Sequence, residues 1–207
     1  MGLSNDDLAM VLDLAFHTTG GVIFDIRDDI PLATFQFTAR NKTGKPASDD
    51  AAYVQHIGEQ IYDNILRRAQ EHDVTKIVYE YTDWHRNILG GKKSINKRRE
   101  ELHIEIRTQR TLGRTEGLLA MIGLLHGYEI IGFGANDVKK SFSAQSKTGV
   151  ARMVAAVLPQ FYQYTGDEKR PLRDIDTGRL LQHHISDALA LALHASQYIR
   201  MQRALNR

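Results

Sequence analysis

The sequence predicts an α/β fold in which a five-stranded mixed sheet is flanked by helices on both faces. Two observations support this. Three apolar segments follow one another within residues 9–39 with only brief polar or glycine-containing connections, as expected for strands joined by hairpins. Two later apolar segments, 76–81 and 129–133, are each preceded by an expected helix, which is typical of βαβ units.

The first three strands are expected at 9–16, 21–26 and 31–39. His17-Thr18-Thr19-Gly20-Gly21 lies between the first two and supplies the glycines that hairpin turns favour. Asp28-Asp29 gives a second tight connection before the third strand. The N-terminal region is therefore expected to be a three-stranded antiparallel unit.

A polar loop is expected at 40–50, where Ser48 is a good N-cap for a helix over 49–72. Apolar residues recur in this helix at helical spacing, at Val54, Ile57, Ile61 and Ile65. A short buried strand is expected to follow at 76–81.

Residues 82–100 combine Gly90-Gly91 with a basic run and have no apolar periodicity. This pattern indicates a loop or the partly ordered start of a helix. A helix over 101–127 and a strand over 129–133 are expected next.

The C-terminal third is expected to contain a polar, lysine-bearing loop at 134–148 and a helix at 148–163. A polar linker at 164–176 then leads into a final helix that runs to about 205. Ala188 to Ala195 alternates alanine and leucine, as a strand can. Alanine's helix propensity and the length of the segment favour a buried helix.

Composition is that of an ordinary globular protein, with 42% hydrophobic and 25% charged residues in 207. One domain over 1–207 is expected. The absence of cysteine excludes a disulfide framework and a thiolate zinc site, and an intracellular setting is expected. The first residues match neither a signal peptide nor a myristoylation site, because Asp6 stands where Ser or Thr is needed. No apolar run approaches the roughly 18 residues of a membrane span, so no membrane partner is expected.

Net charge is only +2, but basic residues concentrate in the middle of the chain. This distribution is typical of a face that binds a polyanion, although a solvated helix face would look the same. The residues concerned are Lys92, Lys93, Lys97, Arg98, Arg99, Arg107, Arg110, Arg114, Lys139, Lys140 and Lys147.

Four residues have the chemistry of a divalent-metal site. Asp13 and Glu80 each end a short apolar run, and His184 and Asp187 lie three apart in the final helix. Two divalent cations about 3.5–4 Å apart require several hard oxygen ligands from distant parts of the chain. Acids at strand ends, together with a pair on one helix face, meet this requirement.

Structural alternatives exist for each of the four. Asp13 could cap a turn, Glu80 could be a solvated strand end, Asp187 could pair within the helices, and His184 could lie on a helix surface. His183 lies four residues before Asp187 and could share its face, so the choice between the two histidines stays open.

Asp25 also ends an apolar run, but register places it at the far end of the hairpin from Asp13. His194 is expected to be a packed or interface histidine.

Five segments, in order between residue 9 and about 195, resemble those of one family. They are Val11 to Ile23, Ile77 to Glu80, Leu112 to Gly117, Asp137 to Lys140 with Lys147 and Met153-Val154, and His184 to Ala190. Together they resemble the RuvC-type Holliday junction resolvases of the RNase H-like superfamily. No single segment is decisive, and the order of all five is fairly specific.

This resemblance implies an RNase H-like fold and a structure-selective endonuclease that resolves four-way junctions by symmetrical nicking. Hydrolysis would use two Mg²⁺ or Mn²⁺ ions and leave a 5′ phosphate and a 3′ hydroxyl. Symmetrical nicking implies a homodimer, for which the helix of 101–127 is the candidate interface. The implied metal ligands and catalytic residues are Asp13, Glu80, His184 and Asp187. The implied DNA contacts are Lys139, Lys140, Lys147, Arg114 and Trp84.

Two departures from the family are visible. The first of the two terminal acids is replaced by His184, as in some members, and histidine suits Mn²⁺ better than Mg²⁺. The basic stretch of 85–100 is absent from the compact bacterial enzymes and suggests a divergent branch, such as a phage-encoded one. A cytoplasmic location, in a bacterium or a phage-infected cell, is the corresponding expectation.

Trp84 lies four residues after Glu80, near the position of an aromatic residue that probes the junction crossover in the resembled enzymes. It could stack on an unpaired base or support the site from a partly buried position. Two other functions stay open: an RNase H-like nuclease acting on branched DNA or RNA–DNA hybrids, and a junction-binding protein with weak catalysis.

Overall fold

A computed structural model describes residues 7–15, 18–39, 51–81, 113–143 and 146–206. The expectations for Ser48, Trp84, the basic stretch of 85–100 and the start of the 101–127 helix lie outside these described residues.

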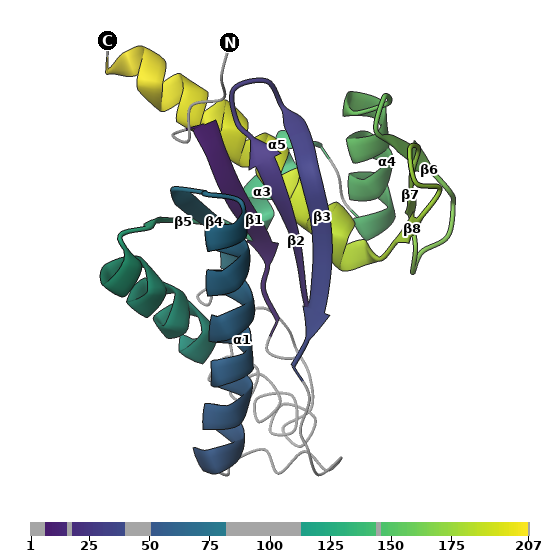
Figure 1. Ribbon diagram of the computed structural model, residues 1–207. Coiled ribbons are helices and arrows are strands. Elements are labelled where there is room, and N and C mark those ends of the chain that lie inside the picture. The colour runs from purple at the N-terminus through teal and green to yellow at the C-terminus, as the bar shows by residue number, and fades with distance from the viewer. Residues whose placement is uncertain (1–6, 16–17, 40–50, 82–112, 144–145, 207) are drawn as a thin grey trace, which may run out of the picture.

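A five-stranded mixed sheet in the order β3-β2-β1-β4-β5 forms the centre of the molecule (Figure 1). The first three strands pair antiparallel, and β4 pairs parallel with both β1 and β5. This arrangement confirms the predicted sheet. The strands are β1 (Leu8–Asp13), β2 (Thr18–Asp25), β3 (Ile30–Thr38), β4 (Lys76–Tyr81) and β5 (Glu129–Gly134).

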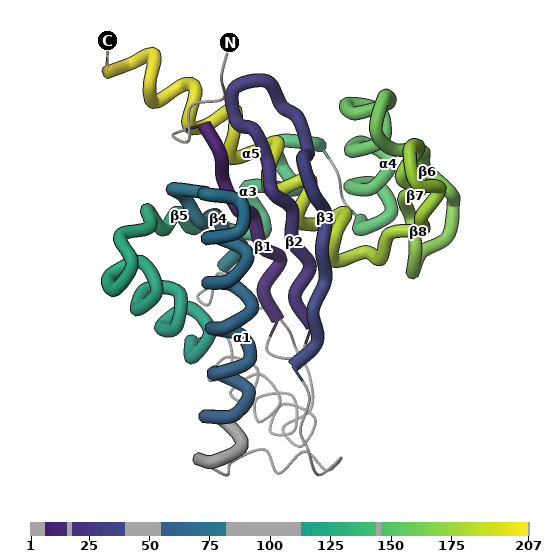
Figure 2. Tube along the Cα trace, in the orientation of Figure 1, coloured from purple at the N-terminus to yellow at the C-terminus, as the bar shows by residue number. Residues whose placement is uncertain are grey.

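Helices cover both faces of this sheet (Figure 2). One face packs against α1 (Ala51–Glu71) and a helix of residues 113–126. The other packs against α5 (His183–Leu205), with α3 (Ala135–Ser141) and α4 (Lys147–Val157) beyond it. None of the described helices is long and apolar enough to cross a membrane.

Side chains of β1 divide between the two faces with the two-residue period of a strand. Ala9 and Val11 lie in the core beside α5, whereas Met10 and Leu12 lie in the core beside α1. All four are at most 1% exposed. Burial on both faces explains why the strand is a continuous apolar run rather than an alternating one.

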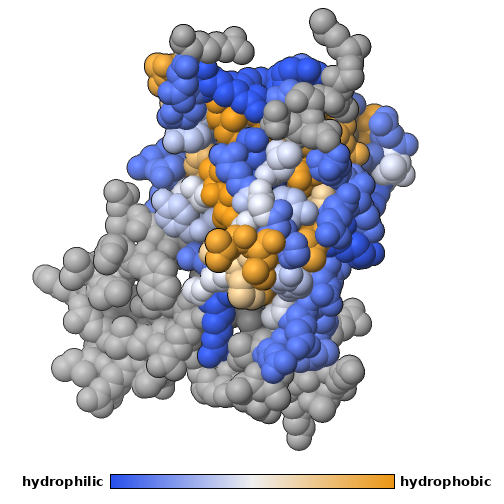
Figure 3. Space-filling view, turned by 60° about the vertical axis from the view of Figure 1, so that its left-hand side comes forward, coloured by the Kyte–Doolittle hydropathy of each residue, from blue (hydrophilic) through white to orange (hydrophobic). Residues whose placement is uncertain are grey.

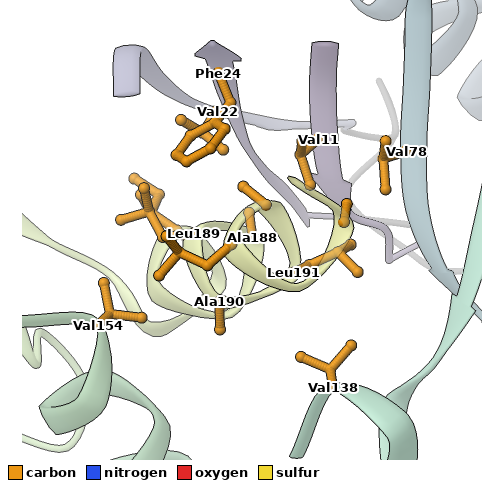
Figure 4. Packing of buried hydrophobic residues seen from close by; sticks show 14 of the residues in the cluster. Val11, Val22, Phe24, Val78, Val138, Val154, Ala188, Leu189, Ala190 and Leu191 are labelled. Carbon is orange, nitrogen blue, oxygen red and sulfur yellow. The ribbon is translucent and has the colours of Figure 1, made fainter. Parts of the chain in front are cut away.

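The first half of α5 is packed on both sides (Figure 4). Val11, Val22 and Val78 of the sheet lie on one side, and Val138 of α3 and Val154 of α4 lie on the other. A helix buried all round needs small and apolar residues on every face. The alternation of alanine and leucine therefore belongs to a buried helix, as predicted.

The predicted turn at residues 17–21 is wrong, because β2 already begins at Thr18 and the two glycines lie inside it. A Cβ on Gly20 would lie 2.5 Å from the backbone carbon and oxygen of His184, and one on Gly21 would overlap the ring of Phe35. These glycines therefore permit close approach of a helix and of a neighbouring side chain, which their turn propensity hides.

The C-terminal elements differ from the prediction in three places. Part of the expected loop at 134–148 forms α3. Val138 is the one buried residue of this short helix, so the sequence has no apolar periodicity there. Helix α4 ends at Val157 instead of 163. The expected linker contributes to a small antiparallel sheet of order β6-β7-β8, made of Tyr162–Tyr164, Leu172–Asp174 and Leu180–Leu181.

The last helix begins at His183, not near residue 176. The segment read as its start is the hairpin turn between β7 and β8. There the Asp174 carboxylate accepts a hydrogen bond of 2.8 Å from the Thr177 amide, and Gly178 has φ +68°. Asp and Thr stabilise turns and helix starts by the same side-chain bonding, so the sequence did not distinguish them.

Candidate active site

Asp13 and Glu80 stand at the carboxyl ends of two adjacent parallel strands. Asp13 is the last residue of β1, and the pairing of Leu12 with Tyr79 in the parallel register of β1 and β4 places Glu80 beside it. Val11 lies two residues before Asp13, and Val78 lies two residues before Glu80. Both valine side chains pack in the core beside α5. Strand periodicity therefore directs both carboxylates to the α5 face.

Helix α5 brings a third carboxylate to the same place. Asp187 lies in the second turn of the helix, directly before the fully buried Ala188, and shares a pocket of about 90 Å³ with Asp13 and Glu80. We call this the carboxylate pocket. It is lined by Asp13, Glu80, Asp187, Lys139, Lys147, Val138, Val150 and Ala190.

Burial and mutual repulsion make it costly for all three carboxylates to be ionised together. Burial, then the charges of Asp13 and Asp187, raises the pKa of Glu80 to about 7. Burial, followed by the charge of Asp13, raises the pKa of Asp187 to about 6. The pocket therefore has an excess of negative charge that a bound cation would relieve.

Two lysines partly offset this charge. Lys147 Nζ lies 3.6 Å from Asp187 Oδ2. Lys147 is the first residue of α4, and the preceding Ser146 caps this helix by accepting a hydrogen bond of 3.0 Å from the Gly149 amide. Lys139 comes from the last turn of α3. Both lysines oppose the raised pKa of Glu80. Both are exposed, so they are also available to an anion entering the pocket.

His184 contacts the site through Asp13. Its Nδ1 lies 2.7 Å from Asp13 Oδ2, and an ionised carboxylate can only accept, so Nδ1 donates this hydrogen bond. In the neutral ring Nε2 then keeps its lone pair for a ligand, as in many metal-binding histidines. The His183 ring lies against the His184 ring, with centroids 3.9 Å apart and the ring planes tilted by 39°. Burial lowers the pKa of His183, and the charge of His184 adds to the effect.

The donor set suits a hard divalent cation, since three carboxylates line one pocket and an imidazole is hydrogen-bonded to one of them. The raised pKa values of Glu80 and Asp187 have the causes expected of such a set, which are burial first and repulsion between the carboxylates second. Among the residues that the structure describes, no three His, Asp or Glu side chains are already close enough to form a ready metal-binding group. The three carboxylates therefore line one pocket, but they are not close enough together to coordinate a single ion without moving.

The remaining predicted DNA contacts have different positions. Lys140 is exposed beside Lys139, pairs with Asp137 at 3.9 Å and does not line the pocket. Arg114 is exposed on the helix of 113–126, which packs on the opposite face of the sheet. Trp84 lies outside the described residues. Of the predicted contacts that lie in the described part of the chain, Lys139 and Lys147 are the ones that line the pocket with the carboxylates.

Two residues that the sequence analysis placed away from the site do lie elsewhere. Asp25 pairs with Leu8 at the opposite end of the hairpin, where its carboxylate accepts hydrogen bonds from the amides of Arg27 and Asp28. His194 packs edge-on against Phe133 with ring centroids 4.9 Å apart.

Sequence reasoning missed three apolar residues that line the pocket, Val138, Val150 and Ala190. They enclose the carboxylates and supply part of the burial that raises their pKa values. The apolar positions of α4, Val150 and Val154, were the available signal, because they place the helix against α5.

No protein-family model and no curated protein sequence matches this chain. Solved structures do. A structure described as Thermus thermophilus RuvC in complex with Holliday junction substrate matches 94% of this chain and 95% of its own, with a TM-score of 0.61 and 16% identity. A second Thermus thermophilus RuvC structure matches 94% of this chain and 96% of its own, with a TM-score of 0.59 and 16% identity.

The likeness extends over nearly the whole chain and shows the fold. This protein has the α/β RNase H-like fold of those structures, with a five-stranded mixed sheet and helices. The sequence-based expectation of that fold is confirmed.

Proposed function

We propose that this protein is a metal-dependent, structure-selective DNA endonuclease that resolves four-way junctions. The observation that carries the proposal is the convergence of Asp13, Glu80 and Asp187 in one pocket with Lys139 and Lys147. Carboxylates suit divalent cations, and the lysines suit a phosphate backbone. The shared fold adds support, because one of the similar structures is that of a RuvC protein with Holliday junction substrate.

Asp13, Glu80, Asp187 and His184 would hold the cations, with Mg²⁺ or Mn²⁺ expected and two ions per site. When bound, such ions supply Lewis acidity at the scissile phosphate and lower the pKa of water. The carboxylates balance the cationic charge and must be ionised to do so. His184 must be neutral to ligate, and its hydrogen bond to Asp13 orients the ring.

Lys139 and Lys147, which line the same pocket as the carboxylates, would bind phosphate oxygens of the strand that is cut. The helix α5 backbone is held rigidly by the core, so Asp187 and His184 keep fixed positions relative to β1. Hydrolysis in line with the leaving 3′ oxygen would give a 5′ phosphate and a 3′ hydroxyl, without a covalent intermediate on the protein.

Symmetrical nicking of a junction needs two such sites, which a homodimer would supply. The helix of residues 113–126 supports this part of the proposal, since Met121, Leu124 and Leu125 are 47%, 85% and 63% exposed. Figure 3 turns that side of the molecule forward and shows apolar surface among hydrophilic surroundings. Apolar area of this kind marks an interaction surface. Light scattering of the wild-type protein and of Leu124→Glu would test it: dimer becoming monomer is expected.

A second candidate is a junction-binding protein with little catalysis. Two observations favour it: Lys147 already pairs with Asp187, and the described carboxylates and histidines form no ready metal group. Both functions require DNA binding, and only the first requires cutting.

The test is incubation of the protein with a labelled immobile four-way junction, a Y-fork and an RNA–DNA hybrid, each in Mg²⁺, Mn²⁺ and EDTA. Paired symmetrical nicks on the junction, lost in EDTA, are expected. Preferential cutting of the fork or hybrid would instead assign another nuclease of this fold. Tight junction binding without cutting in either metal would assign the junction-binding protein.

A further inference from the structure

A second pocket lies on the other side of the first turn of α5, between β3 and the small β6-β7-β8 sheet. Its volume is about 390 Å³, and most of its lining is polar. Figure 1 shows the beginning of α5 between β3 and the small sheet. We call this the arginine pocket; its lining includes Gln36, Thr38, Arg170, Arg179, Gln182 and Ile185.

The two arginines give this pocket its character. Both side chains are exposed, and among the described residues neither Arg170 nor Arg179 forms an ion pair. The nearby Asp167 carboxylate bonds mainly to the backbone: it accepts hydrogen bonds of 2.7 and 3.2 Å from the amides of Lys169 and Arg170. The Arg170 charge attracts this carboxylate more weakly, without a close ion pair. Two guanidinium groups are therefore available to an anion, and guanidinium matches phosphate geometry with paired donors.

The backbone that carries the arginines is fixed. The Arg170 carbonyl accepts a hydrogen bond of 2.7 Å from Thr165 Oγ1, and the Arg179 carbonyl accepts one of 2.9 Å from the Asp174 amide. Gln36 and Thr38 of β3 add neutral polar side chains on the opposite wall. The pocket thus pairs positive charge on one wall with hydrogen-bonding groups on the other.

The two pockets are neighbours along α5. Ile185 lines the arginine pocket and Asp187 lines the carboxylate pocket. These two residues are about 3 Å apart along the helix axis but point about 200° apart around it, so the pockets open on opposite sides of α5. Each DNA strand carries a phosphate about every 3.4 Å of helix axis. A strand that crosses the start of α5, which is about 10–12 Å in diameter with its side chains, would therefore present another phosphate near the arginines about three to four nucleotides from the carboxylate pocket.

We propose that the arginine pocket binds a backbone phosphate of the nucleic-acid strand that enters the carboxylate pocket, with Arg170 and Arg179 as its direct contacts. The proposal rests on the proposed function for its substrate class. It assigns a role to the small sheet, which would hold the strand a few nucleotides from the cut. Such contacts position the backbone without reading its sequence.

The test compares wild type with the double variant Arg170→Gln/Arg179→Gln and with Arg173→Gln. Arg173 is an exposed arginine of β7 that does not line the pocket, so its variant controls for loss of positive charge on the same sheet. Binding of a fluorescent four-way junction and of a fluorescent single-stranded oligothymidylate is measured by anisotropy in EDTA over a range of salt. Junction cutting is measured separately in Mg²⁺ and Mn²⁺.

The double variant is expected to bind both probes about tenfold or more weakly, as for loss of charge-assisted hydrogen bonds. The slope of log binding constant against log salt concentration should be shallower in the double variant by about 0.7 to 0.9, which is the contribution of one phosphate contact. Arg173→Gln should change affinity less than about twofold. Thermal melting of all three proteins should agree, because the substituted side chains are exposed.

Wild-type affinity in the double variant would overturn the proposal, and so would an equal loss in Arg173→Gln. Failure of the proposed function gives a different result. If wild type binds the strand in an arginine-dependent way but cuts no junction, the pocket stands and the endonuclease assignment falls. If wild type cuts and the double variant binds normally, the endonuclease stands and the pocket falls; if wild type binds neither probe, both fall.

Discussion

Gly20 of β2 lies directly against the backbone of His184, at a distance that no side chain could occupy. A Cβ added to Gly20 would be 2.5 Å from both the carbonyl carbon and the carbonyl oxygen of His184. Gly20 also pairs in register with Asp13. One glycine therefore sets the approach of α5 to the sheet at the point where His184 reaches Asp13.

Gly20→Ala should consequently destabilise the protein by about 1–3 kcal/mol or more, because the methyl group meets backbone that cannot rotate away. Junction cutting should fall further than stability alone explains, since α5 carries two of the expected ligands. Chemical denaturation measures the first effect and single-turnover cutting the second. Gly58→Ala is the matched control: nothing lies within 4 Å of its added Cβ, and alanine in helix α1 should be neutral or stabilising by about 0.5–1 kcal/mol. Equal effects of the two substitutions would contradict the packing argument.

Asp13→Asn should reduce junction cutting by about two to three orders of magnitude or more and leave junction binding in place. An amide keeps the shape of the carboxylate but lacks the charge that balances a cation. Gel shift and cleavage assays on the same preparation separate binding from cutting. Asp63→Asn, at an exposed aspartate of α1, removes the same charge away from the pocket and should cut like wild type. Retained cutting in Asp13→Asn would remove this residue from the proposed mechanism.

His184→Asp should keep Mg²⁺-dependent cutting, whereas His184→Ala should lose most of it, by about 10- to 100-fold. Aspartate supplies an oxygen ligand at the start of α5, and alanine supplies none. The measurement is the cutting rate in Mg²⁺ and in Mn²⁺ for both variants, with His183→Ala as the neighbouring control. If His184→Asp and His184→Ala both cut like wild type, His184 is not a ligand; loss only in His183→Ala would give the role to that residue.

The stability of the metal-free protein should fall as pH rises from about 4.5 to about 7. Burial, then the charges of Asp13 and Asp187, raises the pKa of Glu80 from 4.5 to about 7, so the folded protein keeps a proton that the unfolded chain loses. Unfolding then releases protons, and the free energy of unfolding decreases with pH across this window, by about 2–3 kcal/mol. Below pH 4.5 Glu80 is protonated in both the folded and the unfolded protein, so its effect on the free energy of unfolding no longer changes with pH.

Glu80→Gln tests this directly by denaturation at pH 4 and pH 8 in EDTA. The variant should be more stable than wild type at pH 8 and close to it at pH 4, since glutamine has no charge to desolvate. Added Mn²⁺ should raise the melting temperature of wild type more at pH 8 than at pH 5. A wild-type stability that is flat or rising between pH 4.5 and 7 would contradict the assignment of burial and repulsion as the cause.

Lys147→Gln should weaken junction binding and make its salt dependence shallower by about 0.9, the slope of one phosphate contact in duplex DNA. It should also raise the pKa values of Asp187 and Glu80 further, because Lys147 opposes both shifts. Lys140→Gln, which removes the same charge outside the pocket, should have the smaller effect. Anisotropy titrations over a range of salt provide the measurement. An unchanged slope in Lys147→Gln would exclude a phosphate contact at this residue.

Local sequence was sufficient for the central sheet and for the residues that end its strands. The apolar runs before Asp13 and Glu80 predict buried strands. The carboxyl ends of the parallel strands in a βαβ unit lie at the same edge of the sheet, independently of the conformation of the loops. The buried nature of α5 was equally readable, because only a helix with neighbours on every side needs alanine and leucine throughout. These properties depend on neighbours within a few residues or on burial alone.

Tertiary structure alone decided the rest. Gly20 and Gly21 have turn propensity, yet they serve the approach of His184 and Phe35, which lie far from them in sequence. The segment containing Asp174 and Thr177 could start a helix or close a hairpin, and pairing of β7 with β8 selects the hairpin. The contact of Asp13 with His184 joins residues 171 apart, and neither position carries a sequence signal of the other. Local patterns determine which elements form; only packing determines which of their side chains meet.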